Sequence, residues 1–346
     1  MTGTQLASKP TVDSPQAKQL IRPAIAGLGI SVPPKVVTNA ELEKLVDTTN
    51  EWIVTRTGIS ERRISDPTTA TSDLCIEAAR RSLQDAKLSP EALDLIIVCT
   101  VTPDAPVPAT ACIVQDRLGA KNAAAFDLNG GCTGFMYGVA VGSQFVSSGM
   151  YKHVMIIGAD LLSRIVDWTD RTTCILFGDG AGSAIISAAE REDQGILDFH
   201  LRSDGSGRDL LRIEAGGTKC PTSQETVDQK LHFLRMEGRQ VFKFAVHAIL
   251  DGVNTLLKRN HLEVDDIDCF IFHQANLRIL ENASKHLKIP PEKIFTNVHR
   301  YGNTSSASVP LALEEARQAK KFKKGSTIIL VGFGAGLSWA SSLIRW

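Results

Sequence analysis

Short hydrophobic runs alternate with longer stretches of helical period along almost the whole chain. The apolar, β-branched runs predict buried strands, of which the clearest are residues 24–30, 95–100, 154–158, 328–331 and 342–344. Between them, apolar positions at a 3.6-residue period predict helices over residues 72–86, 241–259 and 277–287. Because the strand runs are continuously apolar rather than alternating, we expect sheets covered by helices on both faces. The pattern predicts an α/β fold with two buried sheets.

Two pairs of similar segments lie at one spacing along the chain. LQDAKLSPEALDLIIVCT and LKRNHLEVDDIDCFIFHQ share a helix end, a turn, an aspartate and an apolar strand, and their aspartates lie 268 − 94 = 174 positions apart. The runs VMIIG and IILVG end at Gly158 and Gly332, again 332 − 158 = 174 positions apart. We therefore expect two similar halves, residues 23–190 and 191–346, after a flexible N-terminal extension over residues 1–22. A ligand site is expected where the halves meet.

Composition narrows the class of protein. The 346 residues suffice for two domains of ordinary size, and 38 basic residues balance 38 acidic ones. This balance does not favour nucleic acid or a membrane surface as a partner, and no apolar run is long enough for a membrane span. The seven cysteines form no C-x-x-C pair, which argues against a disulfide framework and against a zinc site. We expect a metal-free protein of the cytoplasm.

Cys132 has an unusual context among these cysteines. The segment AAAFDLNGGCTGFMYGVAVG predicts a strand, a glycine-rich turn and a helix, with Cys132 in the turn. A thiol at a helix N-terminus is favoured as thiolate, and the glycines leave backbone amides free to face an oxyanion. A buried structural cysteine is the alternative, but the surrounding glycines favour a nucleophile. Gly134, Gly138 and Gly142 form a smooth stripe that predicts close packing against a partner helix.

His273 and Asn303 are candidate partners for this thiol. His273 follows the apolar run IDCFIF, and Asn303 lies in the turn YGNTSSAS before a helix that begins near Val309. Each residue alone is more often structural, a core histidine or a turn asparagine. Together with Cys132, however, the two residues provide what a condensation of thioesters needs. The thiol is the nucleophile, and His273 and Asn303 are two neutral hydrogen-bond donors that can stabilise an enolate.

Several motifs in one order carry a family resemblance over residues 24–346. They are VDTTNEWIVTRTGISERR, DLNGGCTGF, FGDGAG, MEGRQVFKFAV, HQANLRI, GNTSSAS and GFGAGLSWASSLIRW. In these motifs the chain resembles the β-ketoacyl-acyl-carrier-protein synthases III, which are thiolase-fold condensing enzymes. The resemblance implies two duplicated α/β halves in five layers, α-β-α-β-α, and a homodimer. It also implies that acyl-CoA and malonyl-acyl carrier protein are substrates and that no cofactor is needed.

The resemblance assigns roles residue by residue. Cys132 is implied to be the acylated nucleophile, with His273 and Asn303 as the decarboxylation pair. The backbone amides of Cys132 and Ala335 are implied to form the oxyanion hole, although many relatives have glycine at the position of Ala335. The resemblance also implies binding residues for coenzyme A and for acyl carrier protein. These are Trp52, Arg56 and Arg171 for coenzyme A, and Gln274, Ala275, Asn276, Leu277 and Arg278 for acyl carrier protein.

Several alternatives stay open. A related condensing enzyme of polyketide, quinolone or hydrocarbon synthesis would share the same three residues. An inactive scaffold that only binds acyl carrier protein is an alternative of another class, and the intact set of three residues argues against it. A hydroxymethylglutaryl-type synthase is disfavoured because the motifs contain no glutamate acid/base. The acyl group is also open: the loop 103–111 is expected near the acyl tunnel or a partner subunit, where small Val107 would admit longer or branched chains.

Overall fold

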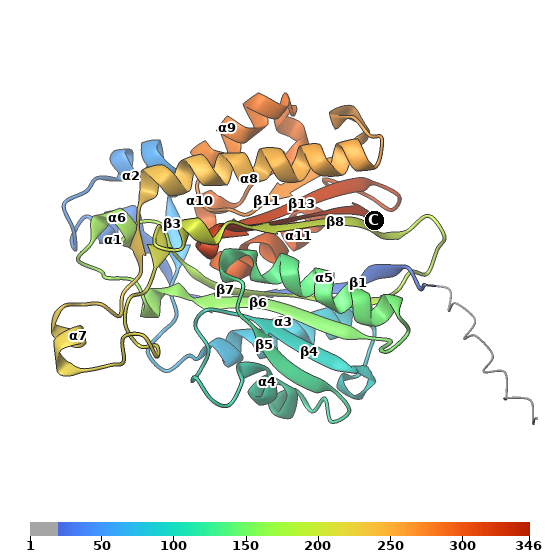
Figure 1. The fold of residues 1–346 in the computed structure, drawn as a ribbon, viewed down its shortest axis with the longest axis horizontal. Coiled ribbons are helices and arrows are strands. Elements are labelled where there is room, and N and C mark those ends of the chain that lie inside the picture. Colours follow the sequence, from blue (N-terminus) through green and yellow to red (C-terminus); the bar gives the residue numbers. More distant parts are fainter. Residues whose placement is uncertain (1–19) are drawn as a thin grey trace, which may run out of the picture.

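The computed structural model describes residues 20–346, so nearly all of the predicted N-terminal extension lies outside the described residues. Two five-stranded mixed sheets form the centre of the molecule (Figure 1). The first has the order β1-β7-β6-β4-β5, with β1 (Pro23–Ser31), β4 (Leu95–Cys99), β5 (Ala124–Leu128), β6 (Val154–Leu161) and β7 (Asp179–Ala188). The second has the order β12-β11-β13-β14-β8, with β8 (Gly195–Ser203), β11 (Cys269–Phe272), β12 (Ile294–Phe295), β13 (Thr327–Gly334) and β14 (Ser338–Arg345).

The two sheets have the same topology. In each sheet, one strand (β4 or β11) pairs in parallel with both of its neighbours. The next strand along (β7 or β14) is antiparallel to the strands on both of its sides. The register also repeats: Leu95 faces Val154 and Cys269 faces Ile328, with 269 − 95 = 174 and 328 − 154 = 174. The duplication predicted from the spacing of similar segments is therefore confirmed.

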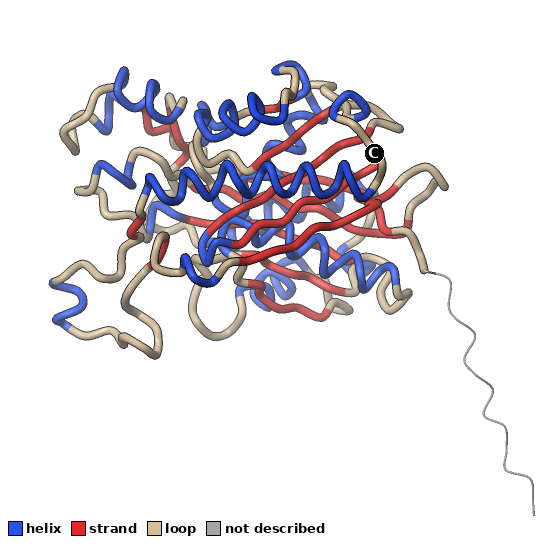
Figure 2. The backbone as a smooth tube through the Cα atoms, turned by 45° about the horizontal axis from the view of Figure 1, so that its top comes forward, coloured by secondary structure: helices blue, strands red, loops and turns tan. Residues whose placement is uncertain are grey.

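Helices fill three further layers, which confirms the five-layered α-β-α-β-α arrangement (Figures 1 and 2). Helices α3 (Thr71–Ala86) and α4 (Thr110–Leu118) cover the first sheet, and α8 (Gly238–Arg259) and α9 (Leu277–Leu287) cover the second. Helices α5 (Gly134–Ser147) and α11 (Ser308–Gln318) lie between the sheets, and each follows a 3-10 turn, Gly131–Thr133 or Ser305–Ala307. The central layer thus interlocks the halves.

Short elements complete the fold at the end of the molecule where the site lies. They are β2 (Val36–Thr38), α1 (Asn39–Leu42), α2 (Asn50–Thr57), β3 (Glu61–Arg63), α6 (Arg171–Cys174), β9 (Leu211–Arg212), α7 (Gln224–Asp228), β10 (Arg235–Met236) and α10 (Val298–Tyr301). The segment that carries α7 projects from the body in both views (Figures 1 and 2). None of the helices in residues 20–346 combines the length and apolar character needed to cross a membrane.

The glycine stripe of α5 faces strands, so the predicted partner helix is wrong. A Cβ at Gly138 would lie 2.6 Å from Cys99 Sγ and 2.7 Å from Ile156 Cγ2, and one at Gly142 would lie 2.8 Å from Ile156 Cδ1. Cys99 ends β4 and Ile156 lies in β6. The stripe therefore lets α5 pack closely on the first sheet. This close packing sets the distance between the sheet and the turn that carries Cys132.

Candidate active site

Cys132 lies in the turn between β5 and α5. The backbone of Gly131 is left-handed (φ 58°), a conformation that glycine adopts without strain, and Cys132 follows it immediately before the first turn of α5. The next residue, Thr133, places its hydroxyl 2.9 Å from Ser338 Oγ and 3.1 Å from Ser338 O at the start of β14. The nucleophile turn of the first half is thereby tied to the second half.

The second half contributes His273 and Asn303. His273 follows β11 directly, and its amide donates to Val331 O of β13 at 2.8 Å. Asn303 follows Gly302, whose left-handed φ of 64° turns the chain, and the Asn303 backbone joins that of 176–178 through Asn303 N to Leu176 O (2.8 Å) and Gly178 N to Asn303 O (3.0 Å). Local turn geometry thus presents both side chains at the end of an element.

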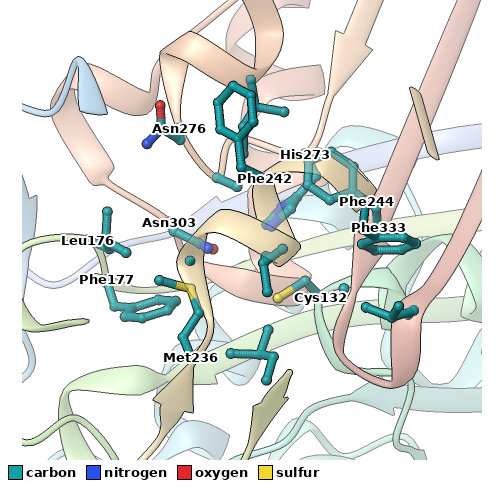
Figure 3. Close-up of a pocket in the computed structure, with 17 residues that line it drawn as sticks. Cys132, Leu176, Phe177, Met236, Phe242, Phe244, His273, Asn276, Asn303 and Phe333 are labelled. Atoms are coloured by element: carbon teal, nitrogen blue, oxygen red, sulfur yellow. The ribbon is translucent and has the colours of Figure 1, made fainter. Parts of the chain in front are cut away.

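The three residues meet in one pocket of about 760 Å³, measured to include its open mouth. Figure 3 shows Cys132, His273 and Asn303 around the same space, with a nitrogen of the His273 ring directed into it. The rest of the lining is mainly apolar and comprises Leu176, Phe177, Leu211, Met236, Gly238, Val241, Phe242, Phe244, Ala275, Asn276, Ile279, Phe333, Gly334 and Leu337. An apolar cavity with a few convergent polar groups suits an acyl chain that carries a reactive carbonyl.

Burial controls the charge of both titratable groups. Desolvation raises the pKa of the Cys132 thiol to about 12, and the hydrogen-bonding influence of Ser305 offsets this only in part. The same physical cause lowers the pKa of His273 to about 3, so the imidazole is neutral at physiological pH. The helix N-terminus by itself would favour the thiolate, but the effect of burial is larger. The Cys132 thiol and the His273 imidazole are therefore both uncharged at neutral pH.

Asn303 is oriented by the backbone that follows it. Its Oδ1 accepts a hydrogen bond from Ser305 N at 2.8 Å, which leaves the Nδ2 amide as the group available to the pocket. Ser305 has a left-handed φ of 52°, a strained conformation for serine that is typical of functional turns. The next serine, Ser306, donates from N (3.2 Å) and from Oγ (2.9 Å) to the buried carboxylate of Asp160.

Ala335 lies beside the Cys132 turn. A Cβ on Gly131 would come within 3.3 Å of Ala335 N, and a Cβ on Gly334 within 2.7 Å of Cys132 N. The positive φ values of this turn fall on Gly336 (73°) and Leu337 (45°), the residues that follow Ala335. Alanine at position 335 therefore fits the backbone without strain.

Trp52, Arg56 and Arg171 form a second cluster at the surface. The Arg171 guanidinium carbon lies 5.4 Å from the centroid of the Trp52 ring, and that of Arg56 lies 5.9 Å from it. Arg171 also donates to the backbone carbonyl of Asp47 at 2.6 Å. Trp52 is 37% exposed, so its ring is an accessible stacking surface rather than core.

The predicted carrier-contact segment divides into buried and exposed residues. Gln274 is only 1% exposed: its side chain donates to Phe272 O (2.7 Å) and accepts from Asn297 N (3.0 Å), so the prediction that it contacts a carrier is wrong for its side chain. Asn276 caps α9 by accepting from Arg278 N at 2.9 Å, and it donates to Arg56 O at 3.2 Å. Ala275 and Leu277 are half-buried, and Arg278 is exposed.

One wall of the pocket was not predicted from the sequence. The segment between β8 and α8 supplies Leu211 and Met236 to the lining; Met236 begins the family motif MEGRQVFKFAV, but no role in the site was assigned to either residue. Val107 lies outside the lining of this pocket and is 84% exposed, so any influence on the acyl group is not exerted within its own chain's pocket.

Residues 20–346 contain no group of three His, Cys, Asp or Glu side chains that could hold a metal ion.

Comparison with known proteins identifies the family. The model of 3-oxoacyl-[acyl-carrier-protein (ACP)] synthase III matches residues 126–205, and the model of that family's C-terminal part matches residues 257–346. A β-ketoacyl-[acyl-carrier-protein] synthase III of Caldanaerobacter subterraneus subsp. tengcongensis is 54% identical over 326 residues, covering 94% of this chain and 98% of that protein. The chain belongs to the β-ketoacyl-acyl-carrier-protein synthase III family.

Solved structures of condensing enzymes agree with this chain in fold. The 3-oxoacyl-[acyl-carrier-protein] synthase III of Aquifex aeolicus VF5 superposes with a TM-score of 0.87 at 41% identity, covering 94% of this chain and all (100%) of that one. The priming β-ketosynthase of the R1128 polyketide pathway gives a TM-score of 0.87 at 32% identity, covering 97% of this chain and 99% of that one. The predicted resemblance and thiolase-like fold are both confirmed.

Proposed function

We propose that the chain is an acyltransferase that condenses an acyl-CoA primer with malonyl-acyl carrier protein, with loss of CO2, to start fatty acid synthesis. The observation that carries the proposal is the convergence of Cys132, His273 and Asn303, from three separate turns, on one apolar pocket. Membership of the synthase III family supports the same reaction. The reaction needs no further cofactor, because both partners are activated thioesters.

In the first step, the Cys132 sulfur attacks the thioester carbonyl of acyl-CoA. A bond forms between Sγ and the acyl carbon, the bond from that carbon to the CoA sulfur breaks, and the thiol proton ends on the CoA sulfur. The transfer consumes no net proton, so a thiol that is protonated at rest is a competent starting state. We assign the stabilisation of the oxyanion to the backbone amides of Cys132 and Ala335; the close approach of the 131–132 and 334–335 backbones supports this assignment.

In the second step, the malonyl carboxylate leaves as CO2 and the resulting enolate carbon attacks the acyl carbonyl. The enolate oxygen gains negative charge, which neutral His273 and the Asn303 amide stabilise as hydrogen-bond donors. The carbon–sulfur bond to Cys132 then breaks, and the thiolate takes up one proton to restore the thiol. Burial favours that protonation because it raises the pKa of Cys132.

Two surface features fit the substrates' carriers. The Trp52 ring flanked by Arg56 and Arg171 offers an aromatic face and two cations to the adenine and phosphates of coenzyme A. Arg278 is exposed at the start of α9 and can meet an acidic carrier protein, with Ala275 and Asn276 at the rim of the pocket. Buried Gln274 supports this segment from below.

The assembly and its location are part of the proposal. Strand β5 is the edge of the first sheet, and it exposes Phe126 (37%) beside an unpaired strand edge, which suits pairing with a second copy in a homodimer. All seven cysteines are free thiols, in keeping with a reducing cytoplasm.

Covalent labelling tests the proposal. Radiolabelled acyl-CoA is expected to leave label on the wild-type protein and on Cys112→Ala, which removes an exposed thiol, but not on Cys132→Ala. Label that persists on Cys132→Ala would refute the mechanism. Failure of any protein to be labelled, together with binding of acyl carrier protein, would favour the scaffold alternative.

A priming ketosynthase of polyketide synthesis is a second candidate, favoured by the 32% identity to the R1128 enzyme. Purified labelled enzyme, offered malonyl groups on a fatty-acid carrier protein and on a polyketide carrier protein, separates the two. Faster condensation with the fatty-acid carrier supports the first proposal, and the reverse order supports the second. Primers of increasing length in the same assay measure the acyl preference.

A further inference from the structure

The imidazole of His273 is held in one orientation. The residue is 1% exposed, and its ring packs against the Phe333 ring with centroids 4.9 Å apart and an interplanar angle of 74°. Its Nδ1 lies 2.6 Å from Ser308 Oγ. Ser308 is not part of the pocket lining, so Nδ1 faces away from the cavity and the Nε2 edge faces into it (Figure 3).

Ser308 is the first residue of α11 and is itself 1% exposed. Its Oγ has two polar partners among residues 20–346: His273 Nδ1 at 2.6 Å and the backbone nitrogen of Gln274 at 2.8 Å. One hydroxyl from the central helix layer thus contacts two consecutive residues at the end of β11.

Hydrogen-bond satisfaction in this cluster favours one arrangement. A backbone N–H can only donate, so Gln274 N donates to Ser308 Oγ. If His273 Nδ1 also donated to Ser308 Oγ, the buried hydroxyl proton of Ser308 would have no acceptor among residues 20–346, so the satisfied arrangement has Ser308 donating to His273 Nδ1. A neutral imidazole carries one proton, and an Nδ1 that accepts must leave that proton on Nε2.

We propose that Ser308 is a positioning residue that fixes His273 as the tautomer protonated on Nε2, so that the ring offers a donor to the pocket. The inference rests on the proposed function for its consequence, since an Nε2 donor serves the enolate oxygen in the decarboxylation step. It also means that His273 does not take the thiol proton during acylation, which passes to the departing CoA sulfur instead. Ser308 therefore matters for condensation and not for acylation.

Nitrogen NMR tests the tautomer without any assay of activity. In wild-type protein labelled with 15N-histidine, the His273 signals, assigned by their loss in His273→Gln, are expected to show a protonated Nε2 and an unprotonated Nδ1. In Ser308→Ala, the Nδ1 proton is expected to appear in part or in full. A protonated Nδ1 in the wild type, or an unchanged pattern in Ser308→Ala, would overturn the inference.

Kinetics separates positioning from general damage. Ser308→Ala is expected to acylate Cys132 at close to the wild-type rate but to condense about 10- to 100-fold more slowly, the usual cost of losing a group that orients a functional histidine. Ser308→Thr, which retains the hydroxyl, is expected to recover most of this loss. Ser284→Ala removes another buried hydroxyl, bonded to Leu280 O at 2.6 Å, and is the matched control that should change neither step.

The outcomes distinguish this inference from the proposed function. Equal loss of acylation and condensation in Ser308→Ala, or no loss in either, contradicts the role given to Ser308 while the wild type still reacts. If the wild type itself is never acylated, the proposed function fails, and the NMR result still decides the tautomer.

Discussion

The Cys132 thiol lies at the start of a helix but inside an apolar pocket, and these surroundings act on its ionisation in opposite directions. The N-terminus of α5 favours the thiolate, whereas desolvation penalises it and raises the pKa to about 12. At neutral pH the thiol form therefore prevails. The reactive thiolate fraction grows as pH rises toward the pKa of the group.

Alkylation kinetics measures which influence prevails. In a Cys112→Ala background, which removes an exposed thiol, the rate of Cys132 modification by iodoacetamide is expected to rise about tenfold per pH unit between about pH 7 and about pH 9, with no plateau. Mass spectrometry of the Cys132 peptide gives the rate. A plateau near neutral pH would show instead that the helix N-terminus dominates and that the pKa is depressed.

At the residue scale, local sequence patterns were enough to single out three residues that the structure brings together. Cys132, His273 and Asn303 each sit in a turn beside glycine or directly after an apolar run, and the structure brings all three to one pocket. Gln274 was misjudged because its hydrogen bonds to Phe272 O and Asn297 N depend on tertiary contacts. Ser308 gave no signal, since a hydroxyl among small residues becomes specific only when β11 and α11 meet.

At the scale of elements, the packing of α5 on the first sheet shows how the nucleophile is held in place. Gly138 has no room for a side chain, because Cys99 and Ile156 lie against its Cα. Overpacking a buried interface of this kind costs about 1–3 kcal/mol, partly offset by the gain of about 1 kcal/mol in helix propensity from glycine to alanine.

Gly138→Ala is accordingly expected to lower the free energy of unfolding by up to about 2 kcal/mol and to slow acylation by shifting Cys132. Urea denaturation measures the first effect and labelling by acyl-CoA the second. Gly217→Ala is the matched control, because a Cβ there meets nothing within 4 Å. A Gly138→Ala protein that is more stable than the wild type and is acylated at the wild-type rate would contradict the close approach of helix and sheet.

The hydrophobic pattern predicted where helices and strands lie more accurately than it predicted their first and last residues. Helix α9 spans the predicted residues, and α8 begins three residues earlier than expected, at Gly238 rather than 241. Strand β14 runs over Ser338–Arg345, not 342–344, because Ser338 and Ser341 are polar in sequence but buried in the fold. Ser341 Oγ donates to Gly252 O of α8 at 3.0 Å, a long-range bond that the pattern could not indicate.

At the scale of the whole molecule, the first sheet ends in an open edge. Strand β5 pairs only with β4 on one side within residues 20–346, and Phe126 is exposed on it. Burying a phenylalanine side chain contributes roughly 1.5–3 kcal/mol, and a twofold interface uses the residue from both copies.

If the proposed homodimer forms through this edge, Phe126→Lys is expected to convert it to monomer, or to weaken association by at least about tenfold, at micromolar concentration. Sedimentation velocity over a concentration series measures the effect. Val227→Lys alters another exposed apolar residue, on α7, and should leave the dimer intact. A monomeric wild type, or a Phe126→Lys dimer as tight as the wild type, would exclude this edge as the interface.

The two 3-10 turns that open the central helices have an implication for the ancestry of the site. Cys132 lies in the turn before α5 and Ser306 in the turn before α11, and 306 − 132 = 174, the same offset that relates the two sheets. One ancestral turn thus gave rise both to the nucleophile and to the segment that holds Asn303 in place. Equivalent turns of the two halves therefore have different tasks in the present molecule: the first presents the thiol, and the second holds Asn303 through Ser305 N.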